Sequence, residues 1–302
     1  MNQFDTIKIS PEELGVPTTD PTKDGDRVPD IIKIWQDELE QDITNEIHLL
    51  DNELDITLKE ESPELVKIIF GLIQVGQIEE AQKQLDSIDM SRNDYREKLM
   101  SLQSRQVDDI EQLYKRLDDD YRTPIEYDGC HRQQNINGSN TCVLASIRNA
   151  VEALAQLGNK IVVTSEEDLY NYIIEKYGEK VFDSETGNLD LITCSVTELV
   201  EQFYRKKAVK SGNLFSLLNT LEKGGVAIIV NGNHARLISS FSVKNSSINF
   251  KVHDPLAPED EANYQLLTLR NIANDVVPSE WWSNMILIED DNQVTDEDIK
   301  RD

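Results

Sequence analysis

Positive charge is scarce in this sequence. Its 302 residues include 30 lysines and arginines against 57 aspartates and glutamates, which gives a formal net charge of −27 at pH 7. Nucleic acids and anionic membranes would repel such a chain, so neither is an expected partner. A basic peptide or protein is compatible with this charge.

Long apolar runs are also missing. No stretch approaches the roughly 18 consecutive apolar residues that a membrane-spanning helix needs. The N-terminus, MNQFDTIKIS, lacks the basic and apolar regions of a secretory signal peptide. We therefore expect a cytoplasmic protein, while secretion by a route without such a signal stays compatible with the sequence.

Cysteine is the third scarce residue type. The chain has three, Cys130, Cys142 and Cys194, an odd number without a Cys-x-x-Cys pair. The number and spacing of these cysteines fit neither a disulfide framework nor a zinc site. We therefore expect reduced thiols, no bound metal and no other cofactor.

One thiol lies where a polar, glycine-containing loop passes into an amphipathic helix. Apolar residues recur every three or four positions after Cys142, and Asn140 or Thr141 is the expected N-cap. Cys142 would then lie in the first helical turn, where unpaired N–H groups and the helix dipole favour the thiolate, the nucleophilic form of cysteine. A buried, unreactive cysteine under the helix start is the alternative.

A histidine and an aspartate lie at the ends of strands expected further downstream. The expected strands cover residues 226–230, 234–243 and 248–252. His234 begins the second of them and Asp254 follows the third. If these two strands pair across a turn near residue 245, both side chains lie at one end of the sheet, as do a general base and the carboxylate that orients it. A histidine with a purely structural role is the alternative.

Periodicity and composition predict two folded units between two tails. Apolar residues at helical spacing precede the acidic run Asp118-Asp119-Asp120, whereas helices followed by strands are expected after it, which predicts an α+β fold. The predicted boundaries are a disordered arm over residues 1–28, a helical bundle or helical-hairpin domain over 29–118, an α+β domain over 119–290 and an acidic, disordered tail over 291–302.

The second unit resembles the papain-like cysteine peptidases, over roughly residues 125 to 290. The resemblance rests on Cys142 at a helix start, a later helix that ends in Gly224-Gly225 before an apolar strand, Gly-x-His ending at His234, and Asp254-Pro255. The branch that it resembles most is the bacteriocin-processing, double-glycine-leader peptidases. The implied fold is a papain-like α+β domain, here preceded by an all-α domain.

The resemblance also implies a role for each site residue. Cys142 would be the nucleophile, His234 the general base and acid, and Asp254 the residue that holds the imidazole. A glutamine upstream of the cysteine would donate to the oxyanion, for which Gln134 is the candidate and Gln133 the alternative.

The resulting hypothesis is a thiol-dependent hydrolase that cleaves a peptide or isopeptide amide through an acyl-enzyme. Acyl transfer to an amine or thiol would use the same residues. A hypothesis of another class is a catalytically silent papain-like domain that binds a peptide. The expected partners are therefore a peptide or protein substrate and a protein that docks on the helical domain. The alternative role of the helical domain is to pack on the second unit.

Overall fold

The computed structural model describes residues 30–61, 68, 71–72, 77, 80, 92–115, 121–157, 165–182, 187–189, 194–204, 206–231, 234–258, 261–278 and 283–289. The predicted arm over residues 1–28 and the predicted tail over 291–302 lie outside these residues. Most of the helical hairpin expected within residues 29–118, before Arg92, also lies outside them.

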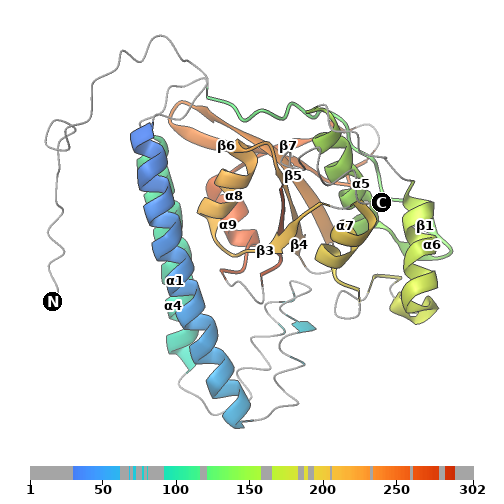
Figure 1. Ribbon diagram of the computed structural model, residues 1–302, viewed down its shortest axis with the longest axis horizontal. Coiled ribbons are helices and arrows are strands. Elements are labelled where there is room, and N and C mark those ends of the chain that lie inside the picture. The colour runs from blue at the N-terminus through green and yellow to red at the C-terminus, as the bar shows by residue number, and fades with distance from the viewer. Residues whose placement is uncertain are drawn as a thin grey trace, which may run out of the picture.

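Helices and one large sheet make up this part of the chain (Figure 1). The helices are α1 (Asp30–Glu61), α4 (Arg92–Tyr114), α5 (Cys142–Ala155), α6 (Glu166–Tyr177), α7 (Val196–Tyr204), α8 (Leu214–Glu222) and α9 (Leu269–Asp275), with a 3-10 turn η1 (Glu179–Val181). The strands are β1 (Asn135–Ile136), β2 (Ser139–Asn140), β3 (Ala208–Lys210), β4 (Val226–Asn231), β5 (His234–Lys244), β6 (Ser247–His253), β7 (Gln265–Thr268) and β8 (Met285–Ile288).

Six of the strands form an antiparallel sheet in the order β3-β8-β4-β5-β6-β7. Helices cover both of its faces, with α5, α6 and α7 on one side and α8, α9, α1 and α4 on the other (Figure 1). The segregation of helices around an antiparallel sheet is the α+β class that the sequence predicts.

Strand β4 shows how the sheet separates two hydrophobic clusters. Val226, Ile228 and Val230 pack with α5, α6 and α7, whereas Ala227 and Ile229 pack with α8 and α9 on the opposite face. The whole run is buried because both faces are covered, and this explains an apolar sequence without polar alternation.

The hairpin of β5 and β6 forms as expected. Asn245 and Ser246 make its two-residue turn, both with positive φ (51° and 58°), a geometry that matches the twist of the flanking strands. The register pairs Leu237 with His253, and a bulge shifts it between Ile238 and Ser240. Strand β7 ends at Thr268, because the side chain of this residue caps α9.

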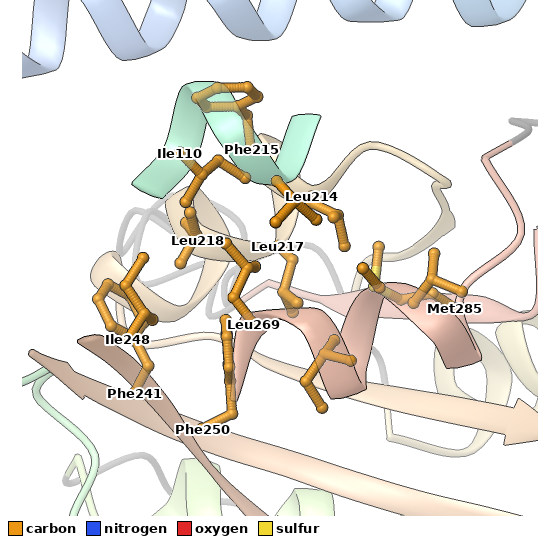
Figure 2. Packing of buried hydrophobic residues seen from close by; sticks show 14 of the residues in the cluster. Ile110, Leu214, Phe215, Leu217, Leu218, Phe241, Ile248, Phe250, Leu269 and Met285 are labelled. Atoms are coloured by element: carbon orange, nitrogen blue, oxygen red, sulfur yellow. The ribbon is translucent and has the colours of Figure 1, made fainter. Parts of the chain in front are cut away.

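The helix pair α1 and α4 shares a hydrophobic cluster with the sheet. Ile43 and Ile47 of α1 and Ile110 of α4 are almost fully buried, in one cluster with α8, α9 and the strands. Figure 2 shows Ile110 among the α8 side chains, close to Phe215 and Leu218. Residues of α1 and α4 therefore share one hydrophobic cluster with the second predicted unit, while the predicted boundary between residues 29–118 and 119–290 stays a prediction.

Polar groups fix the contact between α1 and α8. The side chain of Gln36, which is fully buried, donates to Asn219 Oδ1 (3.1 Å) and to Glu222 Oε2 (3.3 Å). Ser216 Oγ donates to Glu40 at 2.7 Å. These bonds have fixed geometry, so they define one position of α1 on the domain.

Within the described residues, none of the helices has the length and apolar character that crossing a bilayer requires.

Candidate active site

Cys142 is the first residue of α5, as predicted, and Thr141 is the N-cap. A small hairpin leads into this helix: β1 and β2 pair across Asn137 and Gly138, both with positive φ. An Asn-Gly pair at such a turn is a strong hairpin signal that the sequence prediction did not use. The cysteine side chain is buried, with 4% of the residue exposed, under the end of the helix that carries unpaired N–H groups.

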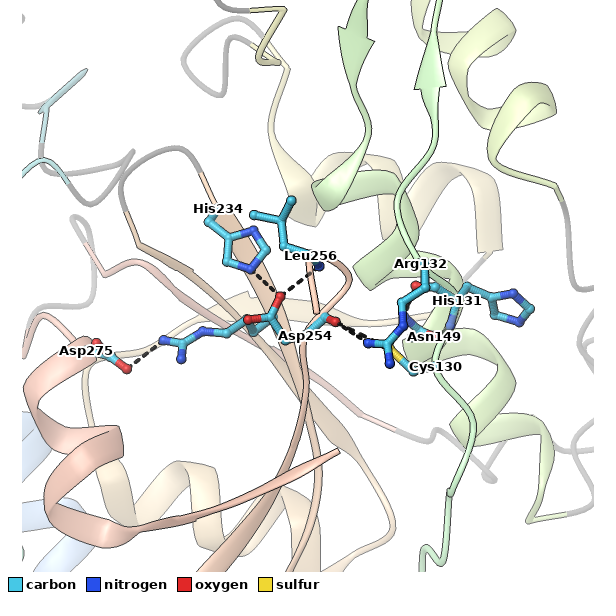
Figure 3. Close-up of polar contacts among 9 residues, drawn as sticks. Cys130, His131, Arg132, Asn149, His234, Asp254, Leu256 and Asp275 are labelled. Atoms are coloured by element: carbon cyan, nitrogen blue, oxygen red, sulfur yellow. Dashed lines mark hydrogen bonds and ion pairs between the residues drawn. The ribbon is translucent and has the colours of Figure 1, made fainter. Parts of the chain in front are cut away.

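His234 and Asp254 lie at the same end of the sheet. His234 begins β5, and Asp254 follows the last residue of β6, which pairs with Leu237. His234 Nε2 and Asp254 Oδ1 are 2.6 Å apart, and Figure 3 shows this contact together with the bond from Leu256 N–H to the same oxygen (2.8 Å). The hairpin therefore brings the two residues together as the sequence predicts.

The second ring nitrogen of His234 has a different environment. His234 Nδ1 is buried without a hydrogen-bond partner among the described residues. Interaction with the Cys142 thiol contributes to the raised pKa of His234. The contact between His234 and Asp254 is therefore observed, whereas the arrangement of all three groups as a triad stays a prediction.

The histidine and the aspartate shift one another's protonation. Burial lowers the pKa of His234, but hydrogen bonds to Asp254 and Cys142 outweigh burial and raise it to about 9. Burial raises the pKa of Asp254, yet hydrogen bonds from His234 and from the Leu256 N–H hold it below its ordinary value. At neutral pH the pair is therefore an imidazolium beside a carboxylate.

The two glutamines considered for the oxyanion differ in environment. Gln134 is exposed, and its backbone N–H donates to Thr141 Oγ1 at 2.8 Å. Gln133 is half-buried, and its side-chain Oε1 is buried without a partner among the described residues. The Gln133 N–H donates to the carbonyl of Pro255 at 3.0 Å, next to Asp254. The choice between Gln134 and Gln133 stays a prediction.

Two further histidines lie near the site without joining it. His253 is fully buried and bonds to Ser239 Oγ (2.8 Å) and the Asn263 carbonyl (3.1 Å), so it faces away from Asp254 as strand geometry predicts. Burial lowers its pKa to about 4 against opposing hydrogen bonds. His131 pairs with Glu152 at 2.5 Å instead of facing solvent alone.

Metal binding finds no support in the described part of the chain, where no group of His, Cys, Asp and Glu side chains has the arrangement of a metal site. Cys194, the third thiol, is fully buried in the cluster beside α5.

Comparison with protein families finds no matching family model, and comparison with curated proteins finds no match. Among solved structures, the crystal structure of UfSP from C. elegans matches with a TM-score of 0.30 and 14% sequence identity. The match covers 55% of this chain and 33% of the UfSP chain. A likeness this coarse does not decide the fold family, so the function has to be inferred from the chain's own site.

Proposed function

We propose that this protein is a thiol-dependent hydrolase that cleaves a peptide or isopeptide amide. The observation that carries the proposal is the contact of His234 Nε2 with Asp254 Oδ1 at 2.6 Å, in a chain where Cys142 begins a helix and its thiol contributes to the raised pKa of His234. A general base aligned by a carboxylate is what an attacking thiol requires. The order of these residues along the chain supports the papain-like superfamily, and the Gly-x-His and Asp-Pro motifs are the reason for proposing its bacteriocin-processing branch.

The reaction follows from the positions of the three groups. The thiolate of Cys142 attacks the amide carbon, and a C–S bond forms while the carbonyl oxygen becomes negative. The His234 imidazolium then gives its proton to the leaving nitrogen as the C–N bond breaks. Water attacks the thioester, His234 takes a proton from that water, and the carboxylic acid leaves as the thiolate is regenerated.

For the oxyanion, we propose the side chain of Gln133 together with N–H groups at the start of α5. The Gln133 side chain is half-buried, with its Oε1 shielded from water, and an amide N–H on such a side chain would act on an oxyanion most strongly where water is excluded. The Gln133 backbone is fixed to Pro255, which follows the triad aspartate directly. Gln134 lacks such burial.

Activity-based labelling tests the proposal without knowledge of the substrate. A peptidyl probe with a thiol-reactive group, offered as a library of recognition residues, should label the folded full-length protein at Cys142. Cys194→Ala is the matched control, because it removes a different buried thiol and should leave labelling intact. Cys142→Ala and His234→Ala should each abolish it.

Two results would overturn the proposal. The first is failure of every library member to label the folded wild-type protein. The second is labelling that persists in His234→Ala, because an ordinary accessible thiol needs no imidazole partner. Mass spectrometry of the labelled peptide identifies the modified cysteine in both cases.

A further inference from the structure

The loop before α5 carries Arg132, whose guanidinium bonds to backbone carbonyls and to a thiol in the described part of the chain. Arg132 Nη1 donates to the Asp254 carbonyl at 2.8 Å and contacts Cys130 Sγ at 3.5 Å. Its Nη2 donates to the carbonyls of Glu261 (3.3 Å) and Ala262 (3.4 Å). The guanidinium thus joins both ends of the turn that follows β6, and Figure 3 shows it reaching the Asp254 backbone.

This turn needs support from outside the sheet. The ladder between β5 and β6 ends at His253, so strand pairing does not fix the backbone of Asp254. Within the turn, the Ala257 N–H donates to the Asp254 carbonyl at 3.1 Å, and the Leu256 N–H donates to the carboxylate. Both of these bonds are local and move with the turn, whereas Arg132 ties it to another segment.

The same segment also reaches the start of α5. Next to Arg132, the Gln133 N–H bonds to the Pro255 carbonyl, and the Gln134 N–H bonds to Thr141 Oγ1. Thr141 in turn contacts the carboxylate of Glu166 at 2.7 Å, and Glu166 is almost fully buried. Three consecutive residues therefore connect the aspartate turn to the residue before Cys142.

We propose that Arg132 is a positioning residue that holds Asp254 at the distance from His234 that the triad requires. The proposal rests on the proposed function for its catalytic meaning, but the positioning itself is measurable without a substrate. Arginine suits this task because its planar guanidinium holds two donating nitrogens apart in a fixed geometry, whereas the donors of a lysine share one nitrogen on a flexible stem. Loss of the fork would free the turn and weaken the contact between the carboxylate and the imidazole.

A purely electrostatic role for Arg132 predicts a different result. A cation near the site opposes protonation of His234, so removal of its charge alone would raise the pKa of that histidine. Loosening of the contact with Asp254 acts in the opposite direction, because this hydrogen bond raises the pKa. The direction of the change therefore separates the two roles.

The experiment is a pH titration of the His234 ring by NMR in the full-length protein and three variants. The chain has only four histidines, which keeps the assignment simple. We expect Arg132→Ala to lower the pKa of His234 by about one unit, a tenfold change in the protonation equilibrium. Arg132→Lys, which keeps the charge without the fork, should lower it in the same direction.

Arg270→Ala is the matched control. Arg270 also bridges two segments through its guanidinium, from α9 to Asp108 and Glu111 of α4, but its bonds do not involve the triad. The Arg270→Ala substitution should leave the pKa of His234 unchanged. Unfolding curves of each variant establish that the titrated protein is folded, and Arg132→Lys keeps the test decisive if the alanine variant does not fold.

The positioning role would be overturned if folded Arg132→Ala raised the pKa of His234 or left it unchanged, or if the lysine variant did so where alanine prevents folding. Failure of the proposed function appears separately, as an absence of probe labelling in the wild-type protein. The titration still decides the role of Arg132 in that case, because it requires neither a probe nor turnover.

Discussion

Asp254→Asn tests the electrostatic centre of the site. The substitution keeps the shape of the side chain and removes its charge. His234 has a pKa of about 9 against an ordinary 6.5, after burial is outweighed by its two hydrogen-bond partners. Without the carboxylate, burial still lowers the pKa of His234 and only the interaction with Cys142 still raises it. We therefore expect this pKa to fall by about two units or more.

The size of the effect follows from these two values. At pH ~7.5, a pKa of about 9 gives roughly thirty protonated rings for each neutral one, whereas 6.5 gives about one in ten. The net shift corresponds to about 3 to 4 kcal/mol in favour of the protonated ring, and to less in practice because 22% of the His234 side chain is exposed. Asparagine therefore changes the dominant protonation state of the ring at neutral pH.

The same coupling predicts how stability depends on pH. A histidine whose pKa is raised on folding stabilises the folded state fully below its unfolded value of about 6.5, and this contribution disappears as pH rises through about 9. The difference in free energy of unfolding between wild type and Asp254→Asn should therefore be larger near pH ~6 than near pH ~10. Urea denaturation at both pH values measures it.

NMR titration of the imidazole signals gives the pKa directly. His253 gives a second titration curve for comparison, since burial lowers its pKa to about 4 and its ring bonds to Ser239 and Asn263 instead of Asp254. Asp275→Asn is the matched control, because that carboxylate pairs with Arg236 at 2.6 Å and bonds to no histidine in the described structure. A wild-type His234 that titrates near 6.5, or one that Asp254→Asn leaves unmoved, would refute the reasoning.

Two other substitutions test the oxyanion assignment and the shared core. Gln133→Ala should reduce labelling by a peptidyl probe about 100-fold, whereas Gln134→Ala should change it little; the reverse ranking of the labelling rates would return the assignment to Gln134. Ile110→Ala should lower the free energy of unfolding by about 2 to 5 kcal/mol in urea, against little change for the exposed Met100→Ala on the same helix, and equal effects would contradict the shared core.

Local sequence signals were sufficient for the parts of the site that depend on one element at a time. Apolar residues at helical spacing place the start of α5 at Cys142. Two alternating segments around a two-residue turn place His234 and Asp254 at one sheet end. Both inferences use the period of a single helix or hairpin, which the order of residues records directly.

The bulge in β5 shows why the rest was harder to predict. Leu237 packs toward α5, and strict alternation would place Phe241 on that same face. Phe241 instead packs with α8 and α9, because the bulge beside Ser239 inserts one residue and reverses the alternation. Ser239 also bonds to His253 across the strands, and no periodic pattern in the sequence predicts this contact.

The packing of α1 and α4 shows which sheet face these helices cover. They lie over α8 and α9, on the sheet face opposite α5, so they are not next to the helix that carries Cys142 (Figure 1). Their buried residues belong to the same hydrophobic cluster as those of α8 and the sheet, and the Gln36 hydrogen bond fixes the position of α1 on α8. Packing on the domain is thus their observed role, and the docking of a protein partner stays a prediction. The inner face of α1 is occupied by this packing and is therefore not available to such a partner.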